Sequence, residues 1–159
     1  MLSSLRTKSF AAFFAACAIS ATALPGAQAA PARGTAADVV AAVNARRVAA
    51  GCRPVHVRSS LNRAAQRHSA DMADNGRLEH AGTDGSRPMQ RMRSAGFRAA
   101  YAGEAIADGV GSAGSVVRLW MDSPSHRELI LTCRFTHAGV GRAGGSGGPW
   151  WTLDLASKR

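Results

Sequence analysis

Two histidines and a glutamate are the side chains of this sequence best suited to chemistry. His80 lies in the segment LEHAGTDG, Glu104 in GEAIA and His126 in WMDSPSHRELIL. Each stands at the edge of a predicted helix or strand, where side chains from distant segments can converge. Two imidazoles and a carboxylate are a ligand set that suits a borderline divalent metal such as Zn²⁺. We therefore take these three residues as a candidate metal or ligand site.

His126 has a further feature that favours metal binding. It follows Pro124 by two residues, within the first turn of a predicted helix. The positive end of a helix lowers the pKa of a histidine, and the neutral imidazole is the form that binds metal. Ser123 and Ser125 also neighbour His126, which raises the alternative of a serine hydrolase. The sequence contains no Gly-x-Ser-x-Gly motif, and adjacent residues do not face each other on a helix, so this alternative ranks below the metal site.

The periodicity of apolar residues predicts helices first and strands last. Helices are predicted over residues 38–51, 61–75, 87–95 and 115–121, followed by a helical turn capped by Ser123, and strands over 105–107, 138–142 and 150–155. Ser60 is the predicted N-cap of the second helix and Gly76 its C-terminal stop. Residues 97–104 are interpreted as a loop, and the glycine run 144–148 as a hairpin loop. His68 shares an apolar helix face with Leu61 and Met72 and is expected in the core. This order indicates an α+β domain with helices packed on a small, mainly antiparallel sheet.

The N-terminal residues have the features of a secretory signal peptide. Arg6 and Lys8 precede an apolar run that ends before Ala27-Gln28-Ala29, a small-x-small cleavage pattern. We expect residues 1–29 to be the signal peptide, 30–37 a linker and 38–159 the folded domain, exported to the periplasm or secreted. The apolar run is too short to span a bilayer well, so no transmembrane segment is expected in the mature protein. A lipoprotein signal ending at Cys17 is a weaker alternative.

Cys52 and Cys133 are the two cysteines left after removal of the signal peptide. In an exported chain of this size they most simply form one disulfide. Neither has a second cysteine or a histidine within two or three residues, which disfavours a metal site at these positions.

The sequence is strongly basic. It carries 20 Lys and Arg against 10 Asp and Glu, a formal net charge of +10. Such a charge favours anionic partners, including envelope polymers, lipid head groups and nucleic acid. The basic residues are dispersed along the chain without a block or interleaved aromatics, so no specific nucleic-acid motif is present, and dispersed solubility charge is the simpler interpretation.

The ordered set LEHAGTDG, GEAIA, WMDSPSHRELIL, GVG (139–141) and WWTLDL (150–155) resembles the CAP superfamily, the cysteine-rich secretory, antigen 5 and pathogenesis-related proteins. The match is to its bacterial secreted branch of SCP-like extracellular proteins and covers about residues 38–155. The resemblance implies an α-β-α sandwich with a groove lined by two histidines and two acidic residues. His80, Glu104 and His126 fall on three of these four positions.

The fourth position of the groove has no clear counterpart. The family pattern places it near Ser123, and Asp122 and Asp84 are the nearby carboxylates. The asparagine that usually follows the family glutamate is Ala105 here. Bacterial relatives often carry the same cysteine pairing, in agreement with a Cys52–Cys133 bridge.

Three hypotheses about function follow from these observations. The leading one is an exported, monomeric, non-enzymatic CAP module whose groove binds a divalent metal, with an anionic envelope component, a lipid or a small molecule as partner. The second is a metal-dependent hydrolase in which Glu104 or Asp84 acts as general base, with His126 as a further catalytic candidate. The third is an electrostatic binder of polyanions or nucleic acid, indifferent to the histidines.

Overall fold

The structure is a computed structural model that describes residues 35–158. The predicted signal peptide and most of the predicted linker lie outside the described residues. The elements, in chain order, are α1 (Ala36–Ala49), β1 (His56–Val57), α2 (Ser59–Asn75), α3 (Pro88–Ser94), β2 (Ala99–Ala107), α4 (Ala113–Asp122), α5 (Pro124–Ile130), β3 (His137–Ala143) and β4 (Trp150–Lys158). No helix within residues 35–158 has the length and apolar character needed to cross a bilayer.

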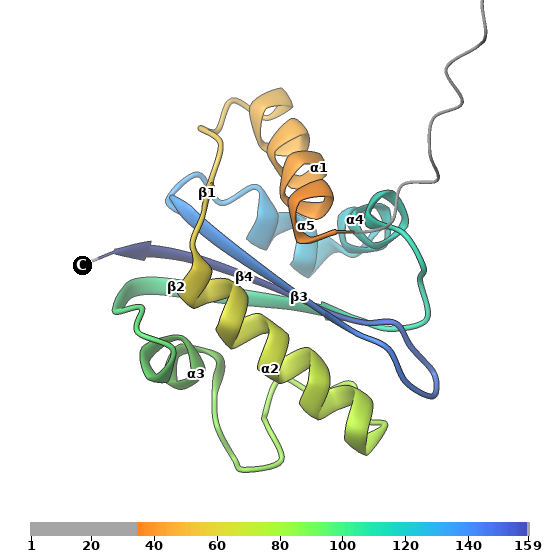
Figure 1. Ribbon diagram of the computed structural model, residues 1–159. Coiled ribbons are helices and arrows are strands. Elements are labelled where there is room, and N and C mark those ends of the chain that lie inside the picture. The colour runs from red at the N-terminus through yellow and green to blue at the C-terminus, as the bar shows by residue number, and fades with distance from the viewer. Residues whose placement is uncertain (1–34, 159) are drawn as a thin grey trace, which may run out of the picture.

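The elements form three layers around one sheet (Figure 1). Helices α1, α4 and α5 cover one face of the sheet, and α2 and α3 cover the other. The strand order is β1-β3-β4-β2, with β4 antiparallel to both neighbours and β1 parallel to β3. This is the α+β sandwich with a mainly antiparallel sheet that the sequence predicts.

The main error of the sequence prediction concerns β2. Residues 97–104 were expected as a loop, whereas the strand runs over all of Ala99–Ala107. Its first half is rich in alanine and contains Gly103, which have low intrinsic strand preference. The strand forms because it pairs with β4 along its whole length, from Lys158 to Trp151, and such pairing between distant segments is invisible in local sequence.

Helices α1, α2 and α4 each begin two residues before the predicted start. Helix α1 begins two residues early because Thr35 and Asp38 form a capping box, each side chain accepting a hydrogen bond from the backbone N–H of the other. Helix α2 begins at Ser59 with Arg58 at the N-cap position, so the predicted cap Ser60 lies inside the helix. Its end is as predicted, with Gly76 in the left-handed conformation at φ 61°.

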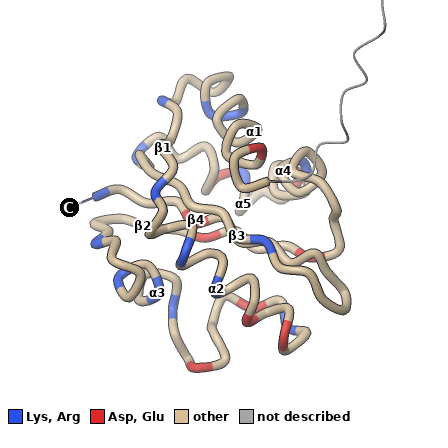
Figure 2. Tube along the Cα trace, viewed as in Figure 1, with Lys and Arg blue, Asp and Glu red and all other residues tan. Residues whose placement is uncertain are grey.

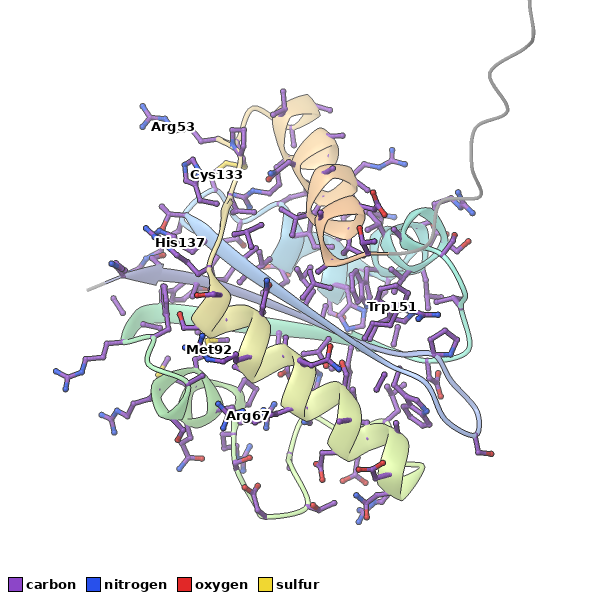
Figure 3. All side chains as sticks on the ribbon, in the orientation of Figure 1. Arg53, Arg67, Met92, Cys133, His137 and Trp151 are labelled. Carbon is purple, nitrogen blue, oxygen red and sulfur yellow. A yellow bond between two sulfur atoms is a disulfide. The ribbon has the colours of Figure 1, made fainter. Side chains whose placement is uncertain are left out.

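Alternation along the strands gives the sheet a different core on each face. The face toward α1, α4 and α5 is wholly apolar and includes Trp120, Trp151 and Leu153. The face toward α2 and α3 carries two smaller apolar clusters, one around Leu61 and Met92 and one around Met72, Ile106 and Trp150. Figure 3 labels Met92 and Trp151, which belong to these opposite sides.

The predicted disulfide joins Cys52 to Cys133, with 4.9 Å between their Cα atoms. Beside it Arg47 is fully buried, and its guanidinium donates hydrogen bonds to the carbonyl oxygens of Ile130 at 2.6 Å and Phe135 at 2.9 Å. The disulfide and this arginine together attach the end of α1 to the segment between α5 and β3.

Candidate functional site

Glu104 is the centre of the polar site. It lies in β2 with its side chain toward α2 and α3, and only 2% of that side chain is exposed. One carboxylate oxygen, Oε1, lies 2.8 Å from Nδ1 of His80, and the other, Oε2, accepts a hydrogen bond of 2.7 Å from Arg91 of α3. Burial raises the pKa of Glu104, but the hydrogen bond from His80 and the positive charge of Arg91 outweigh burial and leave the pKa below its usual value. Glu104 is therefore an ionised carboxylate with both oxygens engaged.

His80 is held by this carboxylate in one orientation. A carboxylate only accepts hydrogen bonds, so Nδ1 of His80 carries the proton and, in the neutral ring, Nε2 carries the lone pair. The side chain is 53% exposed. The loop that carries His80 is fixed by Arg91, which donates to the backbone oxygens of His80 and Ser86 as well as to Glu104. The result is an exposed imidazole with a preset tautomer.

His126 approaches from the opposite layer of the sandwich. It lies in α5, is half-buried, and feels the charge of His80. Burial lowers the pKa of His126, and the neighbouring His80 lowers it further. The lowered pKa favours the neutral form expected from the sequence, with burial as its largest cause and His80 as the second. The two imidazoles thus come from different layers of the sandwich, and the charge of His80 acts on His126.

The described residues only partly match the predicted metal ligands. No group of three or more His, Cys, Asp or Glu side chains within residues 35–158 is arranged to hold a metal ion. The two carboxylate oxygens of Glu104 contact His80 and Arg91. Glu104 is therefore placed to orient His80 as a metal ligand and not to bind the metal itself. The arrangement is that of a histidine backed by a carboxylate, which fixes the ring and raises the basicity of the outer nitrogen.

The match to a family model spans residues 40–155 and is to the CAP family, described as the cysteine-rich secretory protein family. This chain belongs to the CAP family. Among curated proteins, the uncharacterized protein YkwD of Bacillus subtilis (strain 168) is 36% identical over 120 residues, which are 76% of this chain and 46% of YkwD. The chain thus spans about half the length of that relative.

Solved structures have the same CAP fold. An extracellular protein of Bacillus anthracis that contains an SCP domain superposes with a TM-score of 0.73 at 23% identity, covering 77% of this chain and 40% of that one. An outer surface protein of Borrelia burgdorferi superposes with a TM-score of 0.69 at 19% identity, covering 76% of this chain and 90% of that one.

The candidates for the fourth position of the CAP groove make their hydrogen bonds within their own segments. Asp84 is exposed and accepts a hydrogen bond of 2.8 Å from the backbone N–H of Ser86. Hydrogen bonding from the side chain and the backbone of Ser86 lowers the pKa of Asp84. Ser123 lies 3.3 Å from Ser125, Oγ to Oγ, and Asp122 is exposed at the end of α4. None of these side chains has a hydrogen bond or ion pair to His80, Glu104 or His126 among the described residues.

The acidic residue that does lie beside Glu104 is Asp154 of β4. The two are direct cross-strand partners on the face toward α2. Asp154 is 1% exposed, and its Oδ1 has no hydrogen-bond partner among the described residues. Burial raises the pKa of Asp154 well above its usual range, and the negative charge of Glu104 raises it further. Asp154 is therefore the neutral member of a carboxyl pair.

His68 is buried, as predicted, but it is not a satisfied core residue. Neither ring nitrogen has a hydrogen-bond partner among the described residues, and Nε2 lies 3.7 Å from Oε1 of Glu104. Burial lowers the pKa of His68 in spite of the negative charge of Glu104. With Asp154 and the Ser69–Thr152 hydrogen bond of 2.9 Å, it forms a buried polar stripe beneath the site.

Arg91 and Asp154 are the two site residues that sequence reasoning missed. Arg91 is one of several arginines around a short helix, and no local sequence feature distinguishes it from the others. Asp154 does have such a feature, because it is the one carboxylate in the apolar strand WWTLDL. A charged residue in a buried strand needs a partner.

Proposed function

We propose that this protein is an exported bacterial CAP domain that binds a divalent metal ion, such as Zn²⁺, through His80 and His126. The observation that supports this most is the 2.8 Å contact between His80 Nδ1 and buried Glu104, which directs the Nε2 lone pair outward. His126 supplies a second imidazole whose lowered pKa favours the neutral, ligating form. The remaining coordination positions would be open to water or to a ligand from the envelope.

Export is part of the proposal. It rests on the predicted signal peptide, on the disulfide between Cys52 and Cys133, and on similarity to proteins described as extracellular or as outer surface proteins. Disulfides persist outside the reducing cytosol.

Binding is favoured over hydrolysis by the state of Glu104. A general base must lie within hydrogen-bond reach of the water from which it takes a proton. Both oxygens of Glu104 are engaged by His80 and Arg91, and its side chain is 2% exposed. Asp84, the other proposed base, holds the backbone of its own loop.

The test is a zinc titration by calorimetry on the protein from residue 30 onward, at neutral pH. We expect micromolar binding that weakens at least about tenfold in either His80→Ala or His126→Ala, because each removes a direct ligand. Glu104→Gln keeps both imidazoles but removes the carboxylate behind His80, and outer partners of this kind change metal affinity by about 10- to 100-fold. His56→Ala, an exposed histidine of β1, is the matched control and should bind as the unaltered protein does.

Absence of binding, or equal losses in His56→Ala and His80→Ala, would exclude a metal site at these histidines. Circular dichroism of each variant separates loss of ligands from loss of fold.

A further inference from the structure

The fold gathers basic residues that the sequence disperses. Arg58 precedes α2, Arg93 lies in α3, Arg98 precedes β2 and Lys158 ends β4. All four are exposed, and we refer to them together as the basic end. In Figure 2 this is the side on which the C-terminus lies, where basic segments from several elements come together, whereas acidic segments mark the far part of α2 and the loop that follows.

Contacts connect the members of the basic end. Lys158 pairs with Ala99, the neighbour of Arg98, in the sheet register, and Arg98 and Lys158 line one hollow of about 370 Å³. Arg98 and Arg93 line a second hollow of about 600 Å³. Gly96 and Arg98 line both hollows, so the two are neighbours on the surface.

Arg58 completes the set through His137, which is labelled in Figure 3. Its Nη2 lies 3.2 Å from Nε2 of His137. Burial lowers the pKa of His137, and the charges of Arg58, His56 and Lys158 lower it further. The permanent cations Arg58 and Lys158 thus both act on this imidazole.

No Asp or Glu within the described residues neutralises this surface. Among residues 35–158, none of the four cations of the basic end forms an ion pair, and no Asp or Glu lines either hollow. Gathering like charges without counter-charges raises the electrostatic energy of the folded protein and creates a strongly positive local potential. An anion that enters the hollows would lower that energy.

We propose that the basic end binds a linear phosphodiester polymer that carries no bases, of the poly(glycerol phosphate) type. Arg93, Arg98 and Lys158 line two neighbouring hollows, and Arg58, from a fourth segment, lines neither. Cations spread over several segments suit an extended ligand with repeated charges better than a single small anion. Three of the four are arginines, whose paired N–H donors match the oxygens of phosphate.

Two other polyanionic surfaces fit less well. Phe97 is the one aromatic residue that lines either hollow, and it is 3% exposed, so bases of nucleic acid would find no stacking platform. A membrane is flat and is held by apolar side chains that enter it. Here three of the four cations line concave surfaces, where Met89 is the one exposed large apolar side chain.

The experiment measures binding of poly(glycerol phosphate) at NaCl concentrations from about 50 to 200 mM, the range over which phosphate contacts change affinity steeply. The test variant combines Arg93→Gln, Arg98→Gln and Lys158→Gln. The charge-matched control combines Arg46→Gln, Arg67→Gln and Arg118→Gln, three exposed arginines that line neither hollow.

We expect the test variant to bind at least about tenfold more weakly at low salt. Its slope of log K against log salt should be smaller by about one for each contact removed. The control should keep most of the affinity. Equal losses in both variants would show binding by net charge alone and would overturn the proposal, as would the absence of polymer binding.

Three further probes make the ligand class falsifiable. Single-stranded DNA, poly-glutamate and phosphatidylglycerol vesicles should each bind more weakly than poly(glycerol phosphate) at equal charge concentration. A probe that binds as tightly and loses binding in the test variant would replace the phosphodiester polymer as ligand. His126→Ala should bind the polymer normally, so the outcome is independent of the proposed metal site.

Discussion

Two carboxyl groups lie side by side beneath the imidazoles of this site, and their different surroundings give them different charges. Glu104 is ionised because it has His80 and Arg91 as partners. Asp154, opposite it on β4, is buried and lacks such partners. Two adjacent negative charges in a buried layer are unfavourable, so one group holds a proton. The proton on Asp154 lets Glu104 keep the negative charge that orients His80.

Asp154→Asn tests this arrangement through the pH dependence of stability. A carboxyl group whose pKa is raised in the folded state contributes its full stability below the unfolded pKa of about 3.9, and that contribution is lost as pH rises toward the folded value. The asparagine variant has no such loss. Its free energy of unfolding should therefore rise relative to the unaltered protein above about pH 4, by up to about 1.4 kcal/mol per pH unit.

Urea unfolding at several pH values from about 4 to 8 measures this difference. Asp74→Asn, an exposed substitution in α2, is the charge-matched control. A difference between Asp154→Asn and the unaltered protein that stays constant with pH would show that Asp154 is ionised in the folded state.

Sequence reasoning identified part of this site and missed the rest for a physical reason. His80, Glu104 and His126 stand in recognisable motifs. Arg91 acts only through contacts that its short helix brings about. A carboxylate also looks the same in sequence whether it binds a metal or orients a histidine, so the actual role of Glu104 depended on seeing both oxygens engaged.

At the scale of elements, α2 determines where the buried polar stripe lies, and two glycines of β3 determine how closely α2 approaches. A Cβ atom at Gly139 would collide with the backbone of Leu61 and Asn62, and one at Gly141 with the backbone of Ala65 and Gln66. The helix also donates from Gln66 to the carbonyl oxygen of Arg142 at 3.0 Å. Helix and strand are thus in direct backbone contact.

Gly141→Ala should destabilise the protein, because the backbone atoms that it meets belong to a helix fixed at many points. Overpacking of this kind costs about 1–3 kcal/mol, and we expect a value near the upper end. Gly144→Ala is the matched control, since a Cβ atom there meets nothing within 4 Å. Thermal or urea unfolding compares them, and equal stability of the two variants would mean that α2 can move away from the sheet at little cost.

The elements predicted best are those with strong local signals. The face of α2, its glycine stop and the β3–β4 hairpin follow from apolar periodicity and glycine placement. Strand β2 was only partly predicted, because its pairing with β4 depends on residues about 50 positions away. The glycines Gly139 and Gly141 of β3 form a recognisable GVG pattern in the sequence. The reason that glycine is needed there is the close packing of α2, which the sequence does not show.

At the scale of the whole molecule, distant segments acquire shared properties that no window of sequence contains. The basic end joins cations from four elements, although dispersed solubility charge was the simpler interpretation of the sequence. The net charge follows from the composition alone. Where cations gather apart from carboxylates becomes visible only in the folded structure. In the sheet register Ala99, the first residue of β2, pairs with Lys158, the last residue of β4. This pairing brings Arg98 and Lys158 to the same end of the sheet.

The disulfide acts on the same global scale, because it links residues 81 positions apart. On the chain-entropy model, a loop of this length stabilises the folded protein by about 4 kcal/mol. The double variant Cys52→Ala with Cys133→Ala should lose about that much free energy of unfolding. The unaltered protein in reductant should lose a similar amount, and the double variant should not respond to reductant.

The hydrogen bonds of buried Arg47 hold the same region as the disulfide and bear on how that experiment is interpreted. Arg47 already attaches α1 to the carbonyl oxygens of Ile130, Thr132 and Phe135, within the segment that Cys133 anchors. These bonds exist only in the folded state, while the disulfide restricts the unfolded chain, so the two effects should be separate. A loss below about 1 kcal/mol in the double variant would instead mean that the unfolded chain keeps this region together without the covalent link.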